Sequence, residues 1–278
     1  MLVYSIKPFN KILQYYIEEF WILQAEPSPA TMQPILPPKT NFDLILSFAA
    51  PTVWENPGGK RQMLKSSFLC GLRKEPIIID AQGDVDYLAV TFRPHGLYPF
   101  LGFPLSEIVN QSIDLELLAS EFSKYLTEQL FEERNPNRKI ELLEKVLLDM
   151  LNRNNVRMSP ILVQCLRHIQ TSQGLIPIKK LCHTFNIHSK KLEREFQKWV
   201  GVSPKFYSKQ VKMNAILNHI LEHRQNVDWA ELACRFDFFD QPHFIKAFKA
   251  FIGMTPQNFT ENGFTTSDVG RDFCETDF

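Results

Sequence analysis

An internal repeat in the C-terminal third constrains the fold of this 278-residue chain more than any other sequence feature. The two copies are offset by 51 residues before a turn and by 52 residues after it. Such a repeat indicates two copies of one supersecondary unit. The first copy contains Leu181-Cys-x-x-Phe185-Asn-Ile187, Leu192-x-x-x-Phe196 and Gly201-x-Ser-Pro-x-x-Tyr207, and the second contains Leu232-Ala-x-x-Phe236-Asp-Phe238, Phe244-x-x-x-Phe248 and Gly253-x-Thr-Pro-x-x-Phe259.

The spacing within each copy predicts two short helices joined by a tight turn, with apolar residues four apart facing inward. The turn needs a residue in the left-handed conformation, which Asn and Asp tolerate. The second helix needs an N-cap with a side-chain acceptor, and a glycine after its last turn. The matching residues are Asn186 and Asp237 in the turns, Ser189 and Asp240 as N-caps, and Gly201 and Gly253 as closing glycines.

The outward face of the second helix is cationic in the first copy, where it carries Lys190, Lys191, Arg194 and Lys198. A helix-turn-helix unit with a basic second helix typically places that helix in the major groove of DNA. Between the copies, residues 204–222 predict a single helix, about 28 Å long at about 1.5 Å per residue. Consecutive major-groove segments on one face of DNA lie roughly 34 Å apart, so this linker suits two recognition helices.

The net charge of zero conceals a division along the chain. Residues 1–156 have 15 basic and 19 acidic side chains, residues 157–262 have 15 and 8, and residues 263–278 have 1 and 4. A basic segment between two acidic ones is expected where one module meets a polyanion. An accidental excess on a solvated face is the alternative explanation of the charge taken alone.

The sequence argues against an enzyme, so we predict no catalytic residue, no cofactor and no metal site. His95 is the only histidine before residue 168, so a histidine-rich metal site cannot form in the N-terminal part; hydrogen bonding in a loop is its expected role. His219 and His223 have i, i+4 spacing, but no third ligand follows at a clear spacing. No Gly-x-Ser-x-Gly motif or phosphate-binding glycine loop occurs.

The cysteine pattern predicts the compartment. The five cysteines are odd in number and form no Cys-x-x-Cys pair, which predicts neither disulfides nor a zinc site and favours a reducing cytoplasm. We find no secretory signal and no apolar stretch long enough to span a membrane. We therefore expect a cytoplasmic protein that does not bind membranes. The cysteines are Cys70, Cys165, Cys182, Cys234 and Cys274.

The N-terminal part is predicted to contain strands followed by two helices, so the whole chain is predicted to be an α+β protein. Short runs of aromatic and β-branched residues at 42–48, 76–80 and 86–92 predict strands. Prolines make 27–38 a loop or an extended arm, and the pattern at 9–21 fits a helix or a strand. The predicted domains are a β-rich sensor domain at 1–111, a helical hairpin for linking or dimerisation at 112–156, a DNA-binding domain at 157–262 and an acidic tail, expected to be flexible, at 263–278.

The repeat resembles the DNA-binding domain of the AraC family of bacterial transcription regulators over about residues 158–262. The stretch Leu232–Phe259 is similar to the signature region of that family. The resemblance implies seven helices with two helix-turn-helix units that bind DNA, and a cupin-like N-terminal domain. Segments 42–46 and 90–94 are similar to that second domain. By family analogy, activation is the expected sign of regulation.

Carried over by position, the resemblance implies DNA contacts from the second helix of each unit. Asp237 stands where the family usually has glycine, and Lys246 where it usually has arginine. Lysine holds a phosphate but cannot bond a base edge at two points as arginine does. We therefore predict that the first unit supplies most base readout and the second mainly positions the protein. The candidate DNA-binding residues are Ser189, Lys190, Lys191, Glu193, Arg194 and Lys198 in the first unit, and Gln241, His243, Ile245, Lys246 and Lys249 in the second.

The residues leave several alternatives open. Asp237, Pro242 and Ile245 are also compatible with a regulator that acts by protein contact and binds DNA weakly. Arg93 could contact an acidic ligand, but a structural ion pair is favoured. Candidate partners besides double-stranded DNA are a small-molecule effector, RNA polymerase and a second copy of the chain. The aromatic residues that either line an effector pocket or form an ordinary core, which is favoured, are Trp21, Trp54, Phe68, Tyr87, Phe92, Phe100 and Phe103.

Overall fold

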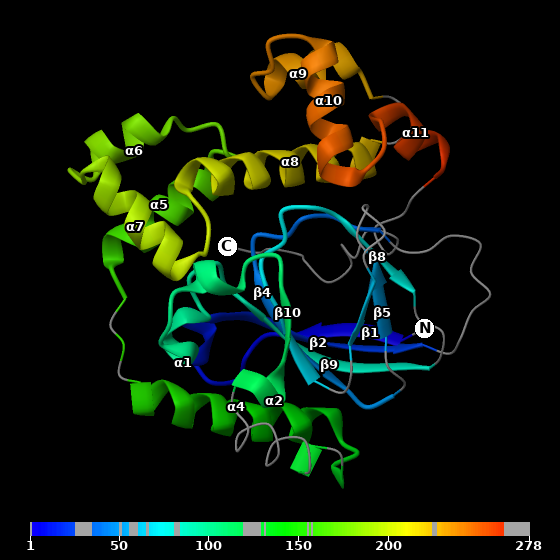
Figure 1. Cartoon of the computed structure of the whole chain (residues 1–278), viewed down its shortest axis with the longest axis vertical. Helices are drawn as coiled ribbons and strands as arrows, with labels where there is room; N and C mark the ends of the chain where they lie inside the picture. Colours follow the sequence, from blue (N-terminus) through cyan, green and yellow to red (C-terminus); the bar gives the residue numbers. More distant parts are fainter. Residues whose placement is uncertain are drawn as a thin grey trace.

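The computed structural model describes residues 2–25, 35–49, 52–55, 61–64, 67–80, 84–118, 129–130, 132–154, 156, 158–223 and 227–263. Within these ranges, strands dominate the N-terminal half and helices form the C-terminal half (Figure 1). The predicted α+β class, with a β-rich N-terminal domain and an all-α C-terminal domain, is therefore confirmed. Nearly all of the predicted acidic tail, 264–278, lies outside the described residues.

The larger sheet has six strands, all paired antiparallel, in the order β1-β2-β9-β4-β7-β10. Three neighbouring strands, β2, β9 and β4, are the longest in this sheet. Most of their residues are buried because apolar side chains pack on both faces of the sheet. The short β10 pairs with β7, so the sheet extends three residues beyond the predicted domain boundary at 111. The strands are β1 (Leu2–Ile6), β2 (Ile17–Ala25), β4 (Phe42–Ser47), β7 (Ser67–Cys70), β9 (Val85–Phe92) and β10 (Ser112–Asp114).

The smaller sheet has four strands in the order β3-β8-β5-β6. Trp21, Phe68 and Tyr87 of the larger sheet form one buried cluster with Ile77 of β8, so an apolar layer joins the two sheets. The three strands predicted from sequence are β4, β8 and β9, while the ambiguous segment at 9–21 forms a 3-10 turn, η1 (Leu13–Tyr15), followed by β2. The smaller sheet consists of β3 (Ile35–Leu36), β5 (Thr52–Glu55), β6 (Arg61–Leu64) and β8 (Ile77–Asp80).

The other face of the larger sheet is covered by helices. On α4 (Pro136–Asn154), Ile140, Leu143 and Leu147 belong to the same buried cluster as the sheet. Glu144 of α4 accepts hydrogen bonds from the backbone N–H groups of residues 9 and 10, at 2.7 and 3.3 Å. This helix therefore packs against the larger sheet and the segment before β2. Short helices before α4 include α1 (Tyr98–Leu101), η2 (Leu105–Ile108) and α2 (Leu115–Leu118). Most of the first helix of the predicted hairpin, at 119–128, lies outside the described residues.

Within residues 158–223 and 227–263, the C-terminal region has seven helices, the number that the family resemblance implies. Two helical pairs stand at opposite ends of α8 (Figure 1): α6 and α7 form the first unit, and α9 and α10 form the second. Among the described residues, no helix combines the length and apolarity needed to cross a membrane. The helices are α5 (Pro160–Thr171), α6 (Ile178–Thr184), α7 (Ser189–Trp199), α8 (Pro204–His223), α9 (Trp229–Arg235), α10 (Gln241–Ile252) and α11 (Pro256–Glu261).

The buried side chains of the two units belong to different cores. Phe196 and Trp199 of the first unit join the cluster that contains Phe92 and Phe100 of the N-terminal domain. The second unit has its own cluster, built from Phe236, Phe244, Phe248, Phe251 and Phe259 with the second half of α8. The first unit is thus packed continuously onto the N-terminal domain, whereas the second is anchored on α8.

Candidate nucleic-acid interface

The turns of both units have the backbone geometry that the repeat predicts. Asn186 has φ 46° and Asp237 has φ 54°, so both occupy the left-handed region. The glycines that follow the second helices are left-handed as well, Gly201 with φ 84° and Gly253 with φ 93°. A second constraint holds Gly201: a Cβ there would lie 2.9 Å from the carbonyl oxygen of Leu105 in the N-terminal domain.

The N-cap prediction is confirmed in the second unit and wrong in the first. The carboxylate of Asp240 accepts a hydrogen bond from the backbone N–H of His243 at 2.7 Å. In the first unit the cap is His188, whose Nδ1 accepts from the N–H of Lys190 at 3.3 Å, and Ser189 is the first helical residue. The boundary is shifted by one residue because an imidazole nitrogen can replace a hydroxyl as the acceptor.

The first turns of α7 present an exposed polar and cationic surface. Ser189, Lys190, Lys191, Glu193 and Arg194 are all exposed; of these, Lys190, Lys191 and Arg194 were predicted to lie on the outward face of the helix. These residues lie in the N-terminal half of α7, the half of a recognition helix that contacts base edges. The arrangement leaves the guanidinium of Arg194 and two ammonium groups facing solvent on one helix.

The structure places Lys198, the last predicted DNA contact of the first unit, away from this exposed group. Its ammonium nitrogen lies 4.9 Å from the centre of the Tyr98 ring, on the N-terminal domain. The neighbouring Trp199 ring lies 4.5 Å from the same tyrosine. The end of α7 is therefore docked on α1 and η2, and Lys198 is half-buried in this domain contact.

The second unit presents fewer polar groups. Gln241, His243, Lys246 and Lys249 are exposed, whereas Ile245 is half-buried. Phe239, which the sequence reasoning missed, is 92% exposed immediately before the cap of α10. An aromatic residue directly before an N-cap and outside the apolar repeat is the signal that could have identified it.

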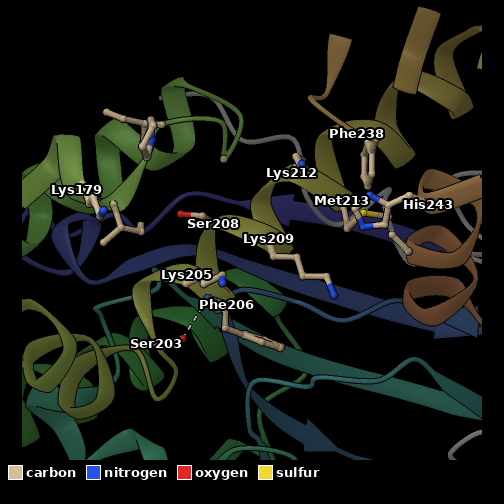
Figure 2. A pocket seen from close by; sticks show the side chains of 15 residues that line it. Lys179, Ser203, Lys205, Phe206, Ser208, Lys209, Lys212, Met213, Phe238 and His243 are labelled. Carbon is tan, nitrogen blue, oxygen red and sulfur yellow. Dashed lines mark hydrogen bonds between the residues drawn. The ribbon is translucent and has the colours of Figure 1, made fainter. Parts of the chain in front are cut away.

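A cleft of about 920 Å³ opens between the two units along α8 (Figure 2); we call it the inter-unit cleft. It is lined by the start of α6 with Lys179, by α8 with Lys205 and Lys209, and by the second unit with His243. Since both units line one cleft, the start of α6 and the first turn of α10 lie on the same side of α8. Sequence reasoning missed these three lysines, although the i, i+4 spacing of Lys205 and Lys209 places them on one face of α8.

Lys212 ties α8 to the turn of the second unit. Its ammonium group donates a hydrogen bond to the carbonyl oxygen of Phe236 at 2.8 Å and lies 4.3 Å from the centre of the Phe238 ring. Burial lowers the pKa of Lys212, an effect that the nearby carboxylate of Asp237 opposes. The negative charge of Asp237 therefore partly offsets the cost of burying the Lys212 ammonium group, which a glycine in this turn could not do.

Comparison with known proteins identifies the helical region. Residues 181–262 match the family model of a helix-turn-helix domain. The C-terminal region of this chain is an AraC-type helix-turn-helix domain. The chain that carries this AraC-type domain is a DNA-binding transcription regulator. Residues 5–114 match a domain of unknown function (DUF6597), and no curated protein matches the chain significantly.

Solved structures that match this chain include ToxT from Vibrio cholerae, with a TM-score of 0.45 and 8% identity over 87% of this chain and 98% of that one. A ToxT structure with a bound unsaturated fatty acid covers 95% of both chains, with a TM-score of 0.43 and 8% identity. The AraC-like transcriptional activator CuxR matches with a TM-score of 0.25 and 13% identity over 80% of this chain and 88% of that one.

The histidines considered as metal ligands have other contacts. His95 is buried, its Nε2 lies 3.1 Å from the carbonyl oxygen of Tyr15, and burial lowers its pKa to about 4. His219 and His223 stack at 4.2 Å between ring centres. In the part of the chain that the structure describes, no three metal-ligating side chains gather. Arg93 donates to the carbonyl oxygen of Gln14 at 3.0 Å, a backbone contact in place of the expected ion pair.

The N-terminal domain contains a buried polar group next to its aromatic core. Asp43 accepts from the hydroxyl of Thr91 at 2.6 Å, and that hydroxyl accepts from the indole N–H of Trp21 at 3.1 Å. Glu19 pairs with Thr91 across the sheet and is buried, and its Oε1 has no hydrogen-bond partner among the described residues. Burial, and then the charge of Glu18, raise the pKa of Glu19 to about 7.

The predicted aromatic residues of this domain are mainly core. Most of them are buried, and Phe103 is half-buried. The side chain of Trp54 lies outside the described residues. The buried ones are Trp21, Phe68 and Tyr87 between the sheets, and Phe92 and Phe100 on the opposite face.

Proposed function

We propose that this cytoplasmic regulator binds double-stranded DNA by inserting α7 and α10 into consecutive major-groove segments. The main supporting observation is that the second helix of each unit bears exposed polar and cationic side chains, and that both units share one linker helix. With 20 residues, α8 is about 30 Å long at about 1.5 Å per residue. This length is close to the spacing of roughly 34 Å between major-groove segments on one face.

The two units have different roles in this proposal. Arg194 reads a base edge, because a guanidinium can form two parallel hydrogen bonds with guanine. Lys190 and Lys191 hold phosphates near it. In the second unit Lys246 and Lys249 bind phosphates, and Phe239 supplies an apolar surface for a thymine methyl group.

DNA binding is tested with a mobility shift on duplexes selected from a random-sequence pool by the full chain. The affinity should fall with salt at a log-log slope of about −0.9 per phosphate contacted. Binding that is weak for every selected sequence and insensitive to salt would favour the alternative regulator that acts by protein contact. The exposed Phe239 would then belong to the protein-binding surface.

We propose that an effector acts on the N-terminal domain through the polar group around Glu19. A buried carboxyl with one oxygen that has no hydrogen-bond partner among the described residues favours a ligand that brings an amine or another donor. The folded-state pKa of Glu19, about 7, exceeds its ordinary value of 4.5. The unfolded chain therefore loses this proton first, so the stability that protonated Glu19 contributes is fully present below about pH 4.5 and is lost as the pH rises to about 7.

The test compares benzylamine with benzoate, which have matched apolar bodies and opposite charges. Benzylamine should raise the melting temperature of the full chain at pH 8, and Glu19→Gln should remove that increase. Glu19→Gln alone should raise the melting temperature at pH 8 more than at pH 5. Stabilisation by benzoate alone would contradict this assignment of effector class.

A further inference from the structure

The inter-unit cleft combines a cationic rim with an apolar floor (Figure 2). Lys179, Lys205 and Lys209 stand exposed at its rim. No acidic side chain is among the described residues that line it. Its rim therefore attracts anions, and Lys74 of the N-terminal domain, 5.5 Å from the ring centre of Phe206, adds a further positive charge.

The floor of the cleft is lined by apolar side chains. Ile178, Phe206, Met213, Phe238 and Ala247 line it from both units and from α8. Ser208 also lines the cleft, and its buried hydroxyl has no hydrogen-bond partner among the described residues. A phosphate backbone has no apolar group to place on such a floor. The occupant that fits best is an anionic segment that also carries large apolar side chains.

Such a segment follows directly in the same chain, at 264–278. It begins after Gly263, two residues beyond the end of α11 at Glu261. Its 15 residues can reach at most about 50 Å when extended. The segment contains four acidic side chains and one basic one, together with four large apolar ones: Asp268, Asp272, Glu275 and Asp277, then Arg271, then Phe264, Val269, Phe273 and Phe278.

We propose that the inter-unit cleft binds the acidic segment 264–278 of the same chain, with its carboxylates on the lysine rim and its phenylalanines on the apolar floor. A short tether gives such a segment an effective concentration in the millimolar range, which adds to the affinity of the free segment. The bound segment neutralises Lys179, Lys205 and Lys209 and covers His243. It therefore competes with DNA, a consequence that rests on the proposed function.

The direct test needs no DNA. A fluorescein-labelled peptide with sequence 264–278 is titrated with a full-length variant whose own segment is neutralised by Asp268→Asn, Asp272→Asn, Glu275→Gln and Asp277→Asn. Fluorescence anisotropy should show saturable binding. Adding Lys205→Gln and Lys209→Gln to the protein should weaken it at least fivefold, whereas adding Lys190→Gln and Lys191→Gln, an equal charge loss on α7 outside the cleft, should change it less than twofold.

The peptide with Phe273→Ser and Phe278→Ser should bind at least fivefold more weakly, because the floor then has no partner. Absence of saturable binding, an equal loss with both lysine pairs, or unchanged binding of the serine peptide would each overturn the proposal. Each of these outcomes is independent of DNA binding, so it leaves the proposed function untouched.

The functional consequence is measured on the full chain with a selected duplex. Neutralising the segment should tighten DNA binding about fivefold, and added peptide should reverse the gain. In a protein that also carries Lys205→Gln and Lys209→Gln, neutralisation should change the affinity less than twofold. An equal gain in both backgrounds would mean that the segment merely repels DNA at a distance, and would overturn the competition.

Discussion

The two helix-turn-helix units share one sequence pattern but differ in what surrounds them. The first is packed into the core of the N-terminal domain through Trp199 and Tyr98, and its recognition helix starts with a neutral cap. The second has a separate core on α8, and its recognition helix starts with the carboxylate of Asp240. The first unit is thus placed where the N-terminal domain can influence it, and the second is more independent.

The two copies of the repeat therefore differ in how directly the N-terminal domain contacts them. The N-terminal half of α7 is exposed, while its C-terminal end contacts the N-terminal domain. An effector that alters the domain contact at Tyr98 would therefore reach Arg194 through a single helix. The second unit has no corresponding aromatic contact among the described residues, which suits a role in positioning.

The largest expected effect concerns the separate cores. Phe248→Ala removes a fully buried ring and should cost about 3–5 kcal/mol of unfolding free energy. Hydrogen exchange should show lost protection over residues 213–259 with the N-terminal sheets unchanged. The matched change Phe196→Ala should instead lower protection in both the first unit and the N-terminal domain. Loss of protection throughout the chain in both variants would refute the division into two cores.

The next effect concerns base readout. Arg194→Ala should cost about 1–3 kcal/mol of binding free energy and relax the preference at one base position. Lys246→Ala should weaken binding evenly across sequences and reduce the salt slope by about 0.9. Both variants are compared on a panel of single-base changes in a selected duplex. If Lys246→Ala relaxes the sequence preference more than Arg194→Ala does, the assigned roles are reversed.

A smaller difference in stability is expected between the N-caps of α7 and α10. Asp240→Ala removes a charged acceptor from the N–H of His243 and should destabilise the second unit by about 1 kcal/mol. His188→Ala should cost the first unit less, because a neutral ring nitrogen at 3.3 Å makes the weaker bond. Urea unfolding followed by hydrogen exchange would measure both. Equal losses would show that the carboxylate adds nothing over the imidazole.

The smallest effect concerns the turn at Asp237. With φ 54°, glycine should fit this turn with less strain, and Asp237→Gly should stabilise the second unit by about 0.5 kcal/mol. The gain is small because the change also removes the carboxylate beside Lys212. Asn186→Gly in the first unit is the comparison, and thermal unfolding is the measurement. A marked loss of stability in Asp237→Gly would show that the carboxylate outweighs the strain.

The sequence predicted the local features of the interface well, because they depend on residues within one or two helical turns. The left-handed positions of Asn186 and Asp237, the cap at Asp240 and the exposure of Arg194 all follow from short-range spacing. The docking of Lys198 on Tyr98 was not predictable, since it joins residues 100 positions apart.

The N-terminal domain was harder to predict for the same reason. Residues 42–48, 76–80 and 86–92 were recognisable as strands, but their order in two sheets depends on pairings between distant segments. Glu144 reads as a surface residue of an amphipathic helix, yet it is buried against the backbone of residues 9 and 10. The inter-unit cleft likewise exists only once α6, α8 and α10 are brought together.

The central claim is that the two units bind consecutive major-groove segments of one duplex. Hydroxyl-radical footprinting of the full chain on a selected duplex tests it most directly. The account predicts two protected segments on one face, about 10 base pairs apart, with Arg194→Ala weakening one and Lys246→Ala the other. A single protected segment, or two segments that respond equally to both substitutions, would contradict it.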